Sequence, residues 1–344
     1  MGITTGRKWK IMGVLLAGAV CACGVLFYII FNDYAEGPLD RGGRLMSTTV
    51  TIPRGASFSF VKAELKRLKL VTRDTFFHMV ALVEGAPTRI RAGEYELNNH
   101  MSPRELLRKL MKGAIKEYRI VIPEGFTVRQ IASRLAAQQL VDGDVFLHLA
   151  GDREFLASLS IPGKSAEGYL FPDTYLFTRS IGEKEMLEVM VRRFRQAITP
   201  EMTARADQLH FRFEDIVTLA SIVQKEGGKK EEMPSIAAVF YNRLKRGMRL
   251  QSDPTVIYGI DDFDGNLTRS HLREKTPYNT YRIRGLPPGP ICNPGLDAIM
   301  AVLYPSTERF LYFVSKNDGS HHFSTNLASH NRAVIKYQIK RQRQ

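Results

Sequence analysis

The stretch Leu219-Ala-Ser-Ile-Val-Gln-Lys-Glu226-Gly-Gly228 places one carboxylate on the apolar side of a predicted helix and then ends that helix. Leu219, Ile222 and Val223 precede Glu226 by seven, four and three residues, so helical spacing puts all four side chains in one stripe. Removal from water and the negative end of the helix at Gly227-Gly228 would both raise the pKa of this carboxyl. Glu226 is therefore a candidate general acid. The alternative is a structural glutamate paired with a buried Arg or Lys.

An apolar segment lies near the N-terminus. Residues 11–31 form a run of 21 residues without a charge, and Arg7, Lys8 and Lys10 precede it. This run is long enough to span a bilayer, and it lacks the short core and cleavage site of a signal peptide. We therefore predict a cytoplasmic tail at 1–10, a transmembrane helix at 11–31, a linker at 32–46 and an exported remainder.

Composition limits the partners of the exported part. The chain has 344 residues, of which 44% are hydrophobic, so two or three globular units are expected. A net charge of +14 exceeds what the basic N-terminal flank contributes. An exported basic surface suits anionic lipid headgroups or a carboxylate-bearing polymer, and we expect no nucleic acid partner. Cys21 and Cys23 fall in the apolar run, which leaves Cys292 without a disulfide partner in the exported part.

Two segments repeat at an offset of 70 residues. The matched pairs are Thr51–Ser57 with Val121–Thr127, and Lys69–Phe76 with Gln139–Phe146. Each copy predicts a strand, a Pro-x-Gly turn and two helices, and Gly93–Leu97 predicts a strand that closes the first copy. Small β-α-α-β units of this kind resemble LysM modules, which bind glycans containing N-acetylglucosamine. We place one LysM-like module at 47–115 and a second repeat at about 117–165, with plain spacer domains as the alternative.

The remainder of the chain predicts a helical scaffold that carries a long polar loop. Apolar residues at three and four spacings predict helices, and a run of large apolar residues predicts a buried strand near the C-terminus. The predicted helices are Glu183–Arg195, Phe213–Glu226, Met233–Arg246 and Asn326–Arg341, and the strand is Phe310–Val314. Residues 247–296 are rich in Pro, Gly, Tyr, Asn and Asp, and such loops commonly carry chemistry. The predicted fold class is α+β: a transmembrane helix, small modules and a mixed catalytic domain with short strands.

Two short motifs in this loop suit a sugar ligand. Asp253 follows Glu226 closely enough for the intervening helix to bring the two polar segments together, although Asp253 before Pro254 is also a sound helix N-cap. Tyr278-Asn-Thr-Tyr281 combines aromatic faces with hydrogen-bonding groups, as sugar binding requires, and it is equally compatible with a turn.

Other catalytic chemistries lack the residues that they need. His321-His322 has no partner set with metal-ligand spacing, so no metal site is predicted. No Gly-x-Ser-x-Gly elbow appears, and Cys292 has no spacing that signals a His partner. The nucleotide-binding glycine patterns are missing too. We therefore predict no cofactor.

Ordered blocks along the chain resemble the MltG (YceG) family of endolytic murein transglycosylases. The blocks are Leu219–Glu226, Val239–Leu244, Gly247–Gly259, Tyr278–Tyr281, Gly285–Gly289 and Thr325–His330, with Glu124-Gly125 and Glu167–Thr174 also matching. The resemblance implies a catalytic domain at 116–344, a bacterial cytoplasmic (inner) membrane location with the catalytic part outside the cytoplasm, and peptidoglycan glycan strands as substrate. Peptidoglycan synthases are expected partners.

The resemblance also implies roles for individual residues. The essential glutamate of the family falls on Glu226, and the family commonly has Glu-x-Glu where this chain has Gln224-Lys225-Glu226. Motif position and suitable chemistry make a further set of residues candidates for binding the sugar: Gln251, Asp253, Tyr258, Asn279, Tyr281 and Asn326. We expect Glu226 in an open groove with Gln251 or Asn279 nearby.

Three functions remain open from the sequence. A lytic transglycosylase uses one carboxyl as acid and then as base, because the C6 hydroxyl of the substrate itself closes on C1. A hydrolytic muramidase would use a second carboxylate, for which Asp253 is available. The third is a non-catalytic anchored scaffold that binds peptidoglycan.

Overall fold

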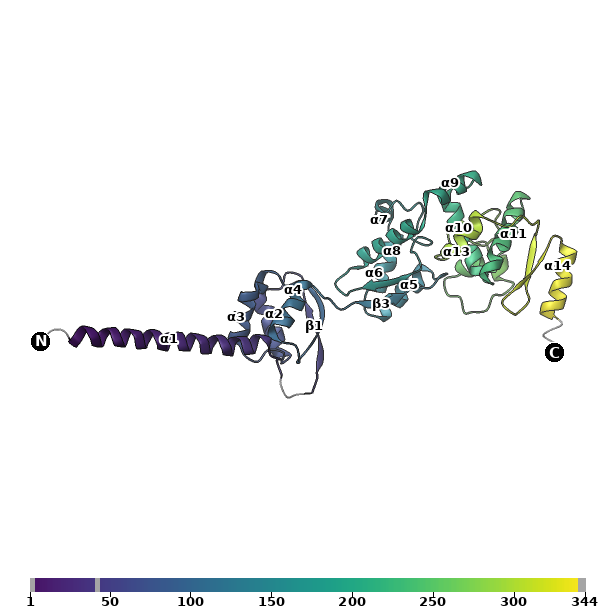
Figure 1. Cartoon of the computed structure of the whole chain (residues 1–344). Coiled ribbons are helices and arrows are strands. Elements are labelled where there is room, and N and C mark those ends of the chain that lie inside the picture. Colours follow the sequence, from purple (N-terminus) through teal and green to yellow (C-terminus); the bar gives the residue numbers. More distant parts are fainter. Residues whose placement is uncertain (1–3, 41–43, 340–344) are drawn as a thin grey trace. The chain divides into compact units, whose positions relative to one another are not determined.

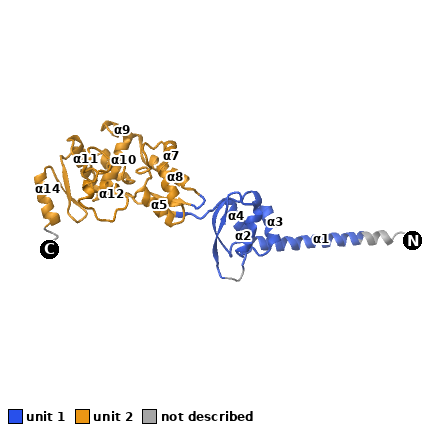
Figure 2. Cartoon of the chain, turned by 180° about the vertical axis from the view of Figure 1, so that it is seen from behind, with its two compact units in different colours: residues 1–118, 178–180 blue, residues 119–177, 181–344 orange. Residues whose placement is uncertain are grey.

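The computed structural model describes residues 4–40 and 44–339, and these divide into two compact units (Figures 1 and 2). Unit 1 comprises residues 1–118 with 178–180, and unit 2 comprises residues 119–177 with 181–344. The elements of unit 1 are α1 (Thr4–Glu36), β1 (Ser47–Ile52), α2 (Phe58–Arg67), α3 (Asp74–Glu84), a 3-10 turn (Ala86–Thr88), β2 (Gly93–Asn98) and α4 (Pro103–Lys112). Mostly helical content, short strands and an N-terminal apolar helix confirm the predicted α+β class.

Unit 1 is built on an antiparallel pair of strands. β1 and β2 pair with Val50 opposite Tyr95, and both side chains are buried, because strand alternation turns them to the helices. Leu65 of α2 and Leu107 of α4 are fully buried in the same core. The order strand, helix, helix, strand is that expected for residues 47–98.

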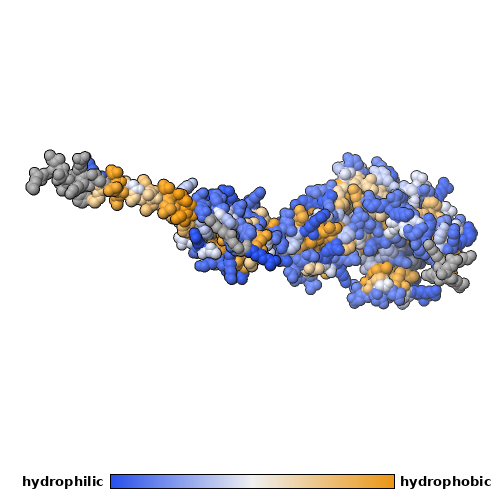
Figure 3. All heavy atoms as spheres, turned by 60° about the horizontal axis from the view of Figure 1, so that its bottom comes forward, coloured by the Kyte–Doolittle hydropathy of each residue, from blue (hydrophilic) through white to orange (hydrophobic). Residues whose placement is uncertain are grey.

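Helix α1 carries the predicted apolar run. Its segment Met12–Glu36 has a mean hydropathy of 2.6 and is long and apolar enough to cross a membrane. Side chains from residue 12 to residue 30 are exposed, and much of this projecting part of the helix is drawn in orange (Figure 3). By length and composition, α1 is therefore compatible with a membrane anchor.

The C-terminal end of α1 belongs to the core of unit 1. The rings of Phe27, Phe31 and Tyr34 lie 6.1, 6.4 and 5.6 Å from the ring of Phe76 on α3. Ala35 is fully buried. The predicted linker at 32–46 therefore differs from the structure at its start, where residues 32–36 are helical, because Tyr34 and Ala35 pack against the unit.

Unit 2 contains the remaining elements. They are β3 (Tyr118–Val121, whose first residue belongs to unit 1), α5 (Val128–Ala137), α6 (Gly143–Gly151), α7 (Arg153–Ser158), β4 (Thr174–Phe177), α8 (Glu183–Ala197), α9 (Pro200–Gln208), α10 (Phe213–Glu226), α11 (Met233–Lys245), α12 (Asp253–Tyr258), α13 (Leu296–Leu303), β5 (Tyr312–Ser315), β6 (His321–Ser324) and α14 (Leu327–Val334). Short 3-10 turns cover Lys230–Glu232 and His271–Arg273, and a π-turn covers Ile335–Ile339. β3 pairs with β4, and β5 pairs with β6 in an antiparallel hairpin.

The backbone repeats at the offset seen in the sequence. Lys69 and Gln139 both adopt a left-handed conformation, with φ of 58° and 55°. The leucines that follow them, Leu70 and Leu140, are both buried. The first part of unit 2 thus has a strand followed by helices and a pairing strand, β3-α5-α6-α7-β4, in the same order as β1-α2-α3-β2.

The second part of unit 2 is the scaffold for the polar loop. Helices α10, α11 and α13 pack on one another through fully buried residues such as Leu219, Val239 and Ile299. α10 has the bounds predicted, and α11 ends one residue before the prediction. The final helix is shorter than predicted, because α14 ends at Val334 and the chain continues as a π-turn, with residues 340 and 341 outside the described part.

Candidate active site

Glu226 is the last residue of α10. The helix ends there because Gly227 adopts φ 73° and ψ −154°, a conformation that side chains strongly disfavour. Ile222 and Val223 are fully buried on the same stripe of α10, as the spacing predicted, while Glu226 keeps part of its surface accessible. The carboxyl thus lies where an apolar core meets a loop.

One hydroxyl donates to the Glu226 carboxyl. Ser252 Oγ lies 2.5 Å from Glu226 Oε1, across 26 residues of sequence. Ser252 is buried and immediately precedes α12, and its backbone N–H donates to Thr280 Oγ1 at 2.9 Å. Thr255 Oγ1 donates to the Ser252 carbonyl at 2.6 Å and lies 2.8 Å from Thr280 Oγ1. This hydroxyl network brings the start of α12 and the Tyr278–Tyr281 loop to the end of α10.

The environment raises the pKa of Glu226 to about 7. Burial is the main cause, because it penalises the charged carboxylate. The Ser252 hydroxyl acts in the opposite direction by stabilising the carboxylate, the negative charge of Asp253 raises the pKa further, and the positive charge of Arg243 lowers it. A carboxyl with this pKa can both give and accept a proton near neutral pH.

Arg243 does not form an ion pair with Glu226. Its guanidinium is buried, and it donates from Nε to the Leu311 carbonyl at 2.7 Å and from Nη1 to the Leu250 carbonyl at 2.5 Å. The salt bridges found among the described residues do not include Glu226. The sequence left open a structural glutamate paired with a buried Arg or Lys. The structure does not show that pairing.

Three predicted sugar-binding residues lie on the segments that meet at Ser252. Asp253 is exposed as the first residue of α12, with Ser252 in the N-cap position instead, and Asp253 Oδ1 accepts from Tyr281 Oη at 2.6 Å. Gln251 is exposed, has φ 51°, and its backbone N–H donates to the Thr280 carbonyl at 3.2 Å. These three side chains come from the two segments that meet at Ser252.

The other three predicted residues have different surroundings. Asn279 is fully buried, and its Nδ2 donates to the carbonyls of His271, Leu272 and Glu274 at 3.2, 3.3 and 2.7 Å, so it shapes the loop. Tyr258 donates to Glu167 Oε2 at 3.2 Å. Asn326 caps α14, where its Oδ1 accepts from the Ser329 N–H at 2.9 Å, and no contact described for it reaches Glu226.

A cavity of about 900 Å³ lies beside this site. Its lining includes Lys225, which precedes Glu226, and Pro254, which follows Asp253. Glu226 itself does not line the cavity. Glu167 also lines it, and this residue was not among the predicted site residues. Gln251 and Asn279 do not line it either, so this cavity is not the groove expected around Glu226.

Glu167 is a second carboxyl with a raised pKa. It is buried, and burial raises its pKa to about 8 against the hydrogen bonds that favour the charged form. Its oxygens accept from the Val128 N–H, from Asn293 Nδ2 at 3.0 Å and from Tyr258 Oη. Its position in the apolar run Ala166–Phe171 was the signal that could have identified it.

The chain is similar to proteins of one known family. The model of the YceG-like family matches residues 50–336, which include Glu226 and all the predicted sugar-binding residues. The chain belongs to the YceG-like family. It is 30% identical over 319 residues to the endolytic murein transglycosylase of Bacillus subtilis, covering 87% of each chain. It is also 30% identical to the protein of that name from Streptococcus pneumoniae strain D39, with 87% of this chain and 60% of that one covered.

A solved structure gives the same assignment. The crystal structure of a YceG-like protein from Listeria monocytogenes matches with a TM-score of 0.59 and 32% identity, and covers 84% of this chain and all of that chain. In this YceG-like chain Gln224 accepts from the Gly295 N–H at 2.9 Å through Oε1. Gln224 therefore holds the start of α13.

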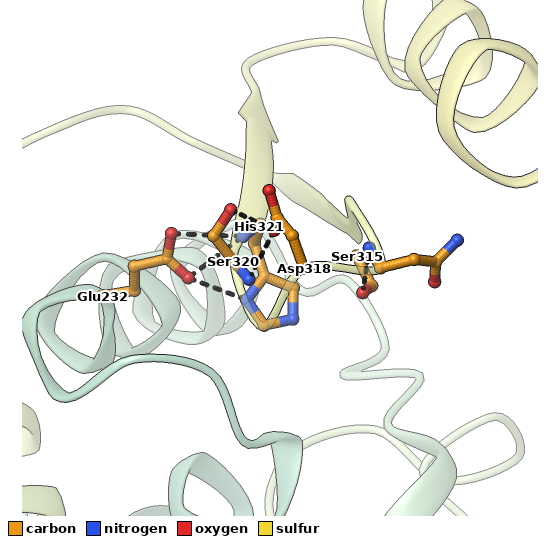
Figure 4. A network of polar contacts seen from close by, with 6 residues as sticks. Glu232, Ser315, Asp318, Ser320 and His321 are labelled. Carbon is orange, nitrogen blue, oxygen red and sulfur yellow. Dashed lines mark hydrogen bonds and ion pairs between the residues drawn. The ribbon is translucent and has the colours of Figure 1, made fainter.

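The loop after Glu226 is held by an acid and histidine pair in this YceG-like chain. Glu232 accepts from the backbone N–H of His321 at 3.1 and 3.0 Å, and its Oε2 lies 2.9 Å from His321 Nδ1 (Figure 4). The imidazole packs against Gly228, where a Cβ would lie 2.9 Å from His321 Cε1. The pair thus ties the β5–β6 hairpin to the segment that follows the candidate acid.

Removal of the Ser252 hydroxyl should change the pH profile of this YceG-like protein. In Ser252→Ala the carboxylate of Glu226 loses its donor, so its pKa rises further above 7. An acid must be protonated to act, so the alkaline limb of kcat/KM for strand cleavage should move to higher pH by up to about one unit. The plateau rate should fall by about 10-fold, because the carboxyl is less well positioned. Ser158→Ala, which removes a hydroxyl bonded to the Phe155 carbonyl, is the matched control. An unchanged alkaline limb would contradict the role of Ser252.

Proposed function

We propose that this chain is a membrane-anchored endolytic peptidoglycan lytic transglycosylase. It cleaves the β-1,4 bond from N-acetylmuramic acid to N-acetylglucosamine within glycan strands and leaves 1,6-anhydro ends. The observation that carries the proposal is the environment of Glu226: one hydroxyl donor, no ion-pair partner among the described residues, and a pKa raised to about 7. The names of the B. subtilis and S. pneumoniae relatives support the same activity.

In the proposed reaction Glu226 acts twice. The protonated carboxyl gives its proton to the glycosidic oxygen as the bond from that oxygen to C1 of the muramoyl residue breaks. The C6 hydroxyl of the same sugar then bonds to C1, and its proton returns to Glu226. No water is consumed and Glu226 ends as it began, so the mechanism needs neither a metal nor a protein nucleophile.

The surrounding residues position the sugar. We assign direct contacts to Gln251, Asp253 and Tyr281, since exposed polar groups and an aromatic ring suit a pyranose. Tyr258 contributes from the cavity wall. Asn279 acts through the shape of its loop, and Asn326 stays a proposed contact at the start of α14.

The proposal also covers the membrane orientation of the chain and the role of residues 47–115. We propose that residues 1–10 lie in the cytoplasm and that the catalytic part, residues 116–344, lies outside the inner membrane, an orientation that the basic flank supports. Residues 47–115 are LysM-like and hold glycan, a proposal supported by the β1-α2-α3-β2 order. Cleavage close to the membrane would act on nascent strands, so peptidoglycan synthases are the proposed partners.

A hydrolytic muramidase is the second candidate. The observation in its favour is that the Asp253 carboxylate lies close enough to raise the pKa of Glu226, so a second carboxylate is available to activate water. Against this role, Asp253 accepts the short hydrogen bond from Tyr281 Oη.

The ends of the products distinguish the two reactions. Purified peptidoglycan digested with the full-length protein should yield new 1,6-anhydro-muramic ends by mass spectrometry. Reducing muramic ends would establish the hydrolase instead. Binding to sacculi without any new ends would favour the non-catalytic scaffold.

A further inference from the structure

The cavity beside Glu226 has a composition that the cleavage reaction does not require. It lies within unit 2, between the start of α5, the end of α6, residues 164–167 and the α12 segment. Its charged lining residues are Arg129, Lys164, Glu167, Lys225 and Asp261. A volume of about 900 Å³ is at the upper end of ordinary ligand sites.

Cations dominate the polar part of this cavity. Arg129 and Lys164 are exposed, and neither has a hydrogen bond or ion pair with another described residue. Lys225 Nζ makes one long contact, 3.4 Å to the Gly125 carbonyl. Asp261 is the opposing charge, because burial keeps Glu167 protonated at neutral pH. Such a lining attracts carboxylates.

The rest of the cavity lining is largely apolar. The rings of Tyr258 and Tyr278 meet edge to face with centroids 4.8 Å apart, and Ile257, Ile260 and Phe263 continue this wall. Tyr258 can also contact the sugar from this wall, but a neutral sugar ring gives the free cations no partner. Free cations beside aliphatic and aromatic side chains suit a short peptide that carries carboxylates and methyl groups.

Two residues that line the cavity are close in sequence to the candidate acid and its hydrogen-bond donor. Lys225 directly precedes Glu226, and Pro254 lies two residues after Ser252, which donates to Glu226. In peptidoglycan the peptide is attached to the lactyl group of the muramoyl residue, the sugar whose C1 bond is cleaved. A muramoyl residue at Glu226 therefore has its peptide within reach of this cavity.

We propose that this cavity, with Arg129, Lys164 and Lys225 as carboxylate partners, binds the stem peptide of the muramoyl residue at the cleavage site. The proposal rests on the proposed function, since it assumes a peptidoglycan strand as substrate. Recognition of the peptide would direct cleavage to strands that still carry peptides.

Binding measurements with the full-length protein test the proposal separately from catalysis. Soluble glycan strands would be prepared with their peptides, with the peptides removed by an amidase, and with the peptide carboxylates converted to amides. In a Glu226→Gln background, Arg129→Ala with Lys164→Ala should weaken binding of the peptide-bearing strands by about 2- to 30-fold, the combined effect expected for two exposed charge contacts. Binding of the amidated strands should not change, and binding of the stripped strands, which keep only the lactyl carboxylate that the amidase frees, should weaken less than binding of the peptide-bearing strands.

The control removes the same two charges elsewhere in unit 2. Lys245→Ala with Arg246→Ala changes exposed residues at the end of α11, outside the cavity lining, and should bind all three strands as the background does. Equal weakening on all strands would assign the cavity to further sugar rings, and no weakening would overturn the proposal. Failure of the wild-type protein to cleave any strand would instead contradict the proposed function, whatever the binding results.

Discussion

The Glu226→Gln protein is expected to cleave glycan strands about 10²- to 10⁴-fold more slowly than the wild-type protein, since an amide can neither give nor take the proton. The substitution preserves the shape of the side chain, and the amide oxygen can still accept from Ser252. Chromatography of soluble products over time measures the rate. Glu231→Gln, on the exposed turn that follows, is the matched control and should keep full activity.

The same variant should also change the pH dependence of stability. The pKa of Glu226 is about 7 in the folded protein and near its ordinary 4.5 in the unfolded chain, so the folded state retains a proton that the unfolded state releases. This contribution is fully present below about pH 4.5 and is lost as the pH rises through 7. Thermal melts at pH 5 and pH 8 should therefore differ less for Glu226→Gln than for the wild-type protein.

Two results would contradict the assignment of Glu226. Near wild-type cleavage by Glu226→Gln would remove it from the mechanism. Loss of cleavage in Glu167→Gln with activity retained in Glu226→Gln would move the acid to the cavity, where burial also favours a protonated carboxyl.

Gly168→Ala is expected to destabilise unit 2 by about 3 kcal/mol. Gly168 has φ +89°, which side chains disfavour, and its N–H donates to Asn293 Oδ1 at 2.9 Å. A Cβ would lie 2.5 Å from Pro290 Cγ and 3.0 Å from Val217 Cγ1, both on rigid neighbours. For a unit of this size the melting temperature should fall by roughly 6 to 12 °C.

A second glycine separates the effect of the positive φ from the effect of the steric contact with Pro290. Gly163→Ala has φ +129° but open space around the added Cβ, so it should cost only about 1 kcal/mol. Denaturant unfolding followed by circular dichroism measures both variants. Equal stability losses would show that the packing against Pro290 is not what makes Gly168 necessary.

The scaffold of the site could be predicted because local patterns determine it. The bounds of α10 follow from an apolar stripe and two glycines, and the helix forms as the sequence indicates. The convergence of the Glu226 and Asp253 segments also followed from the length of the intervening helix, and the bond from Ser252 to Glu226 confirms it. These features depend on residues that are close in sequence.

Features that depend on distant partners were harder to predict. Glu167 is surrounded by Val128, Tyr258 and Asn293, from three separate segments, so the apolar run Ala166–Phe171 could indicate its burial but not its partners. Asn279 was predicted to bind sugar because of its motif position and polar side chain. Its buried amide instead donates to backbone carbonyls of a loop, which have no partners in a helix or sheet. A charged residue, Asp33, marks where the apolar run ends, but it does not mark the end of the helix.

That helix end decides where the protein can be shortened for work in solution. Ala35, Phe31 and Tyr34 belong both to the apolar helix and to the hydrophobic core of unit 1. A truncation after residue 31 would remove Phe27 and Phe31, expose the Phe76 ring and leave an apolar patch that favours aggregation. A soluble version should therefore begin immediately before β3 and give up unit 1, rather than retain that unit without its helix.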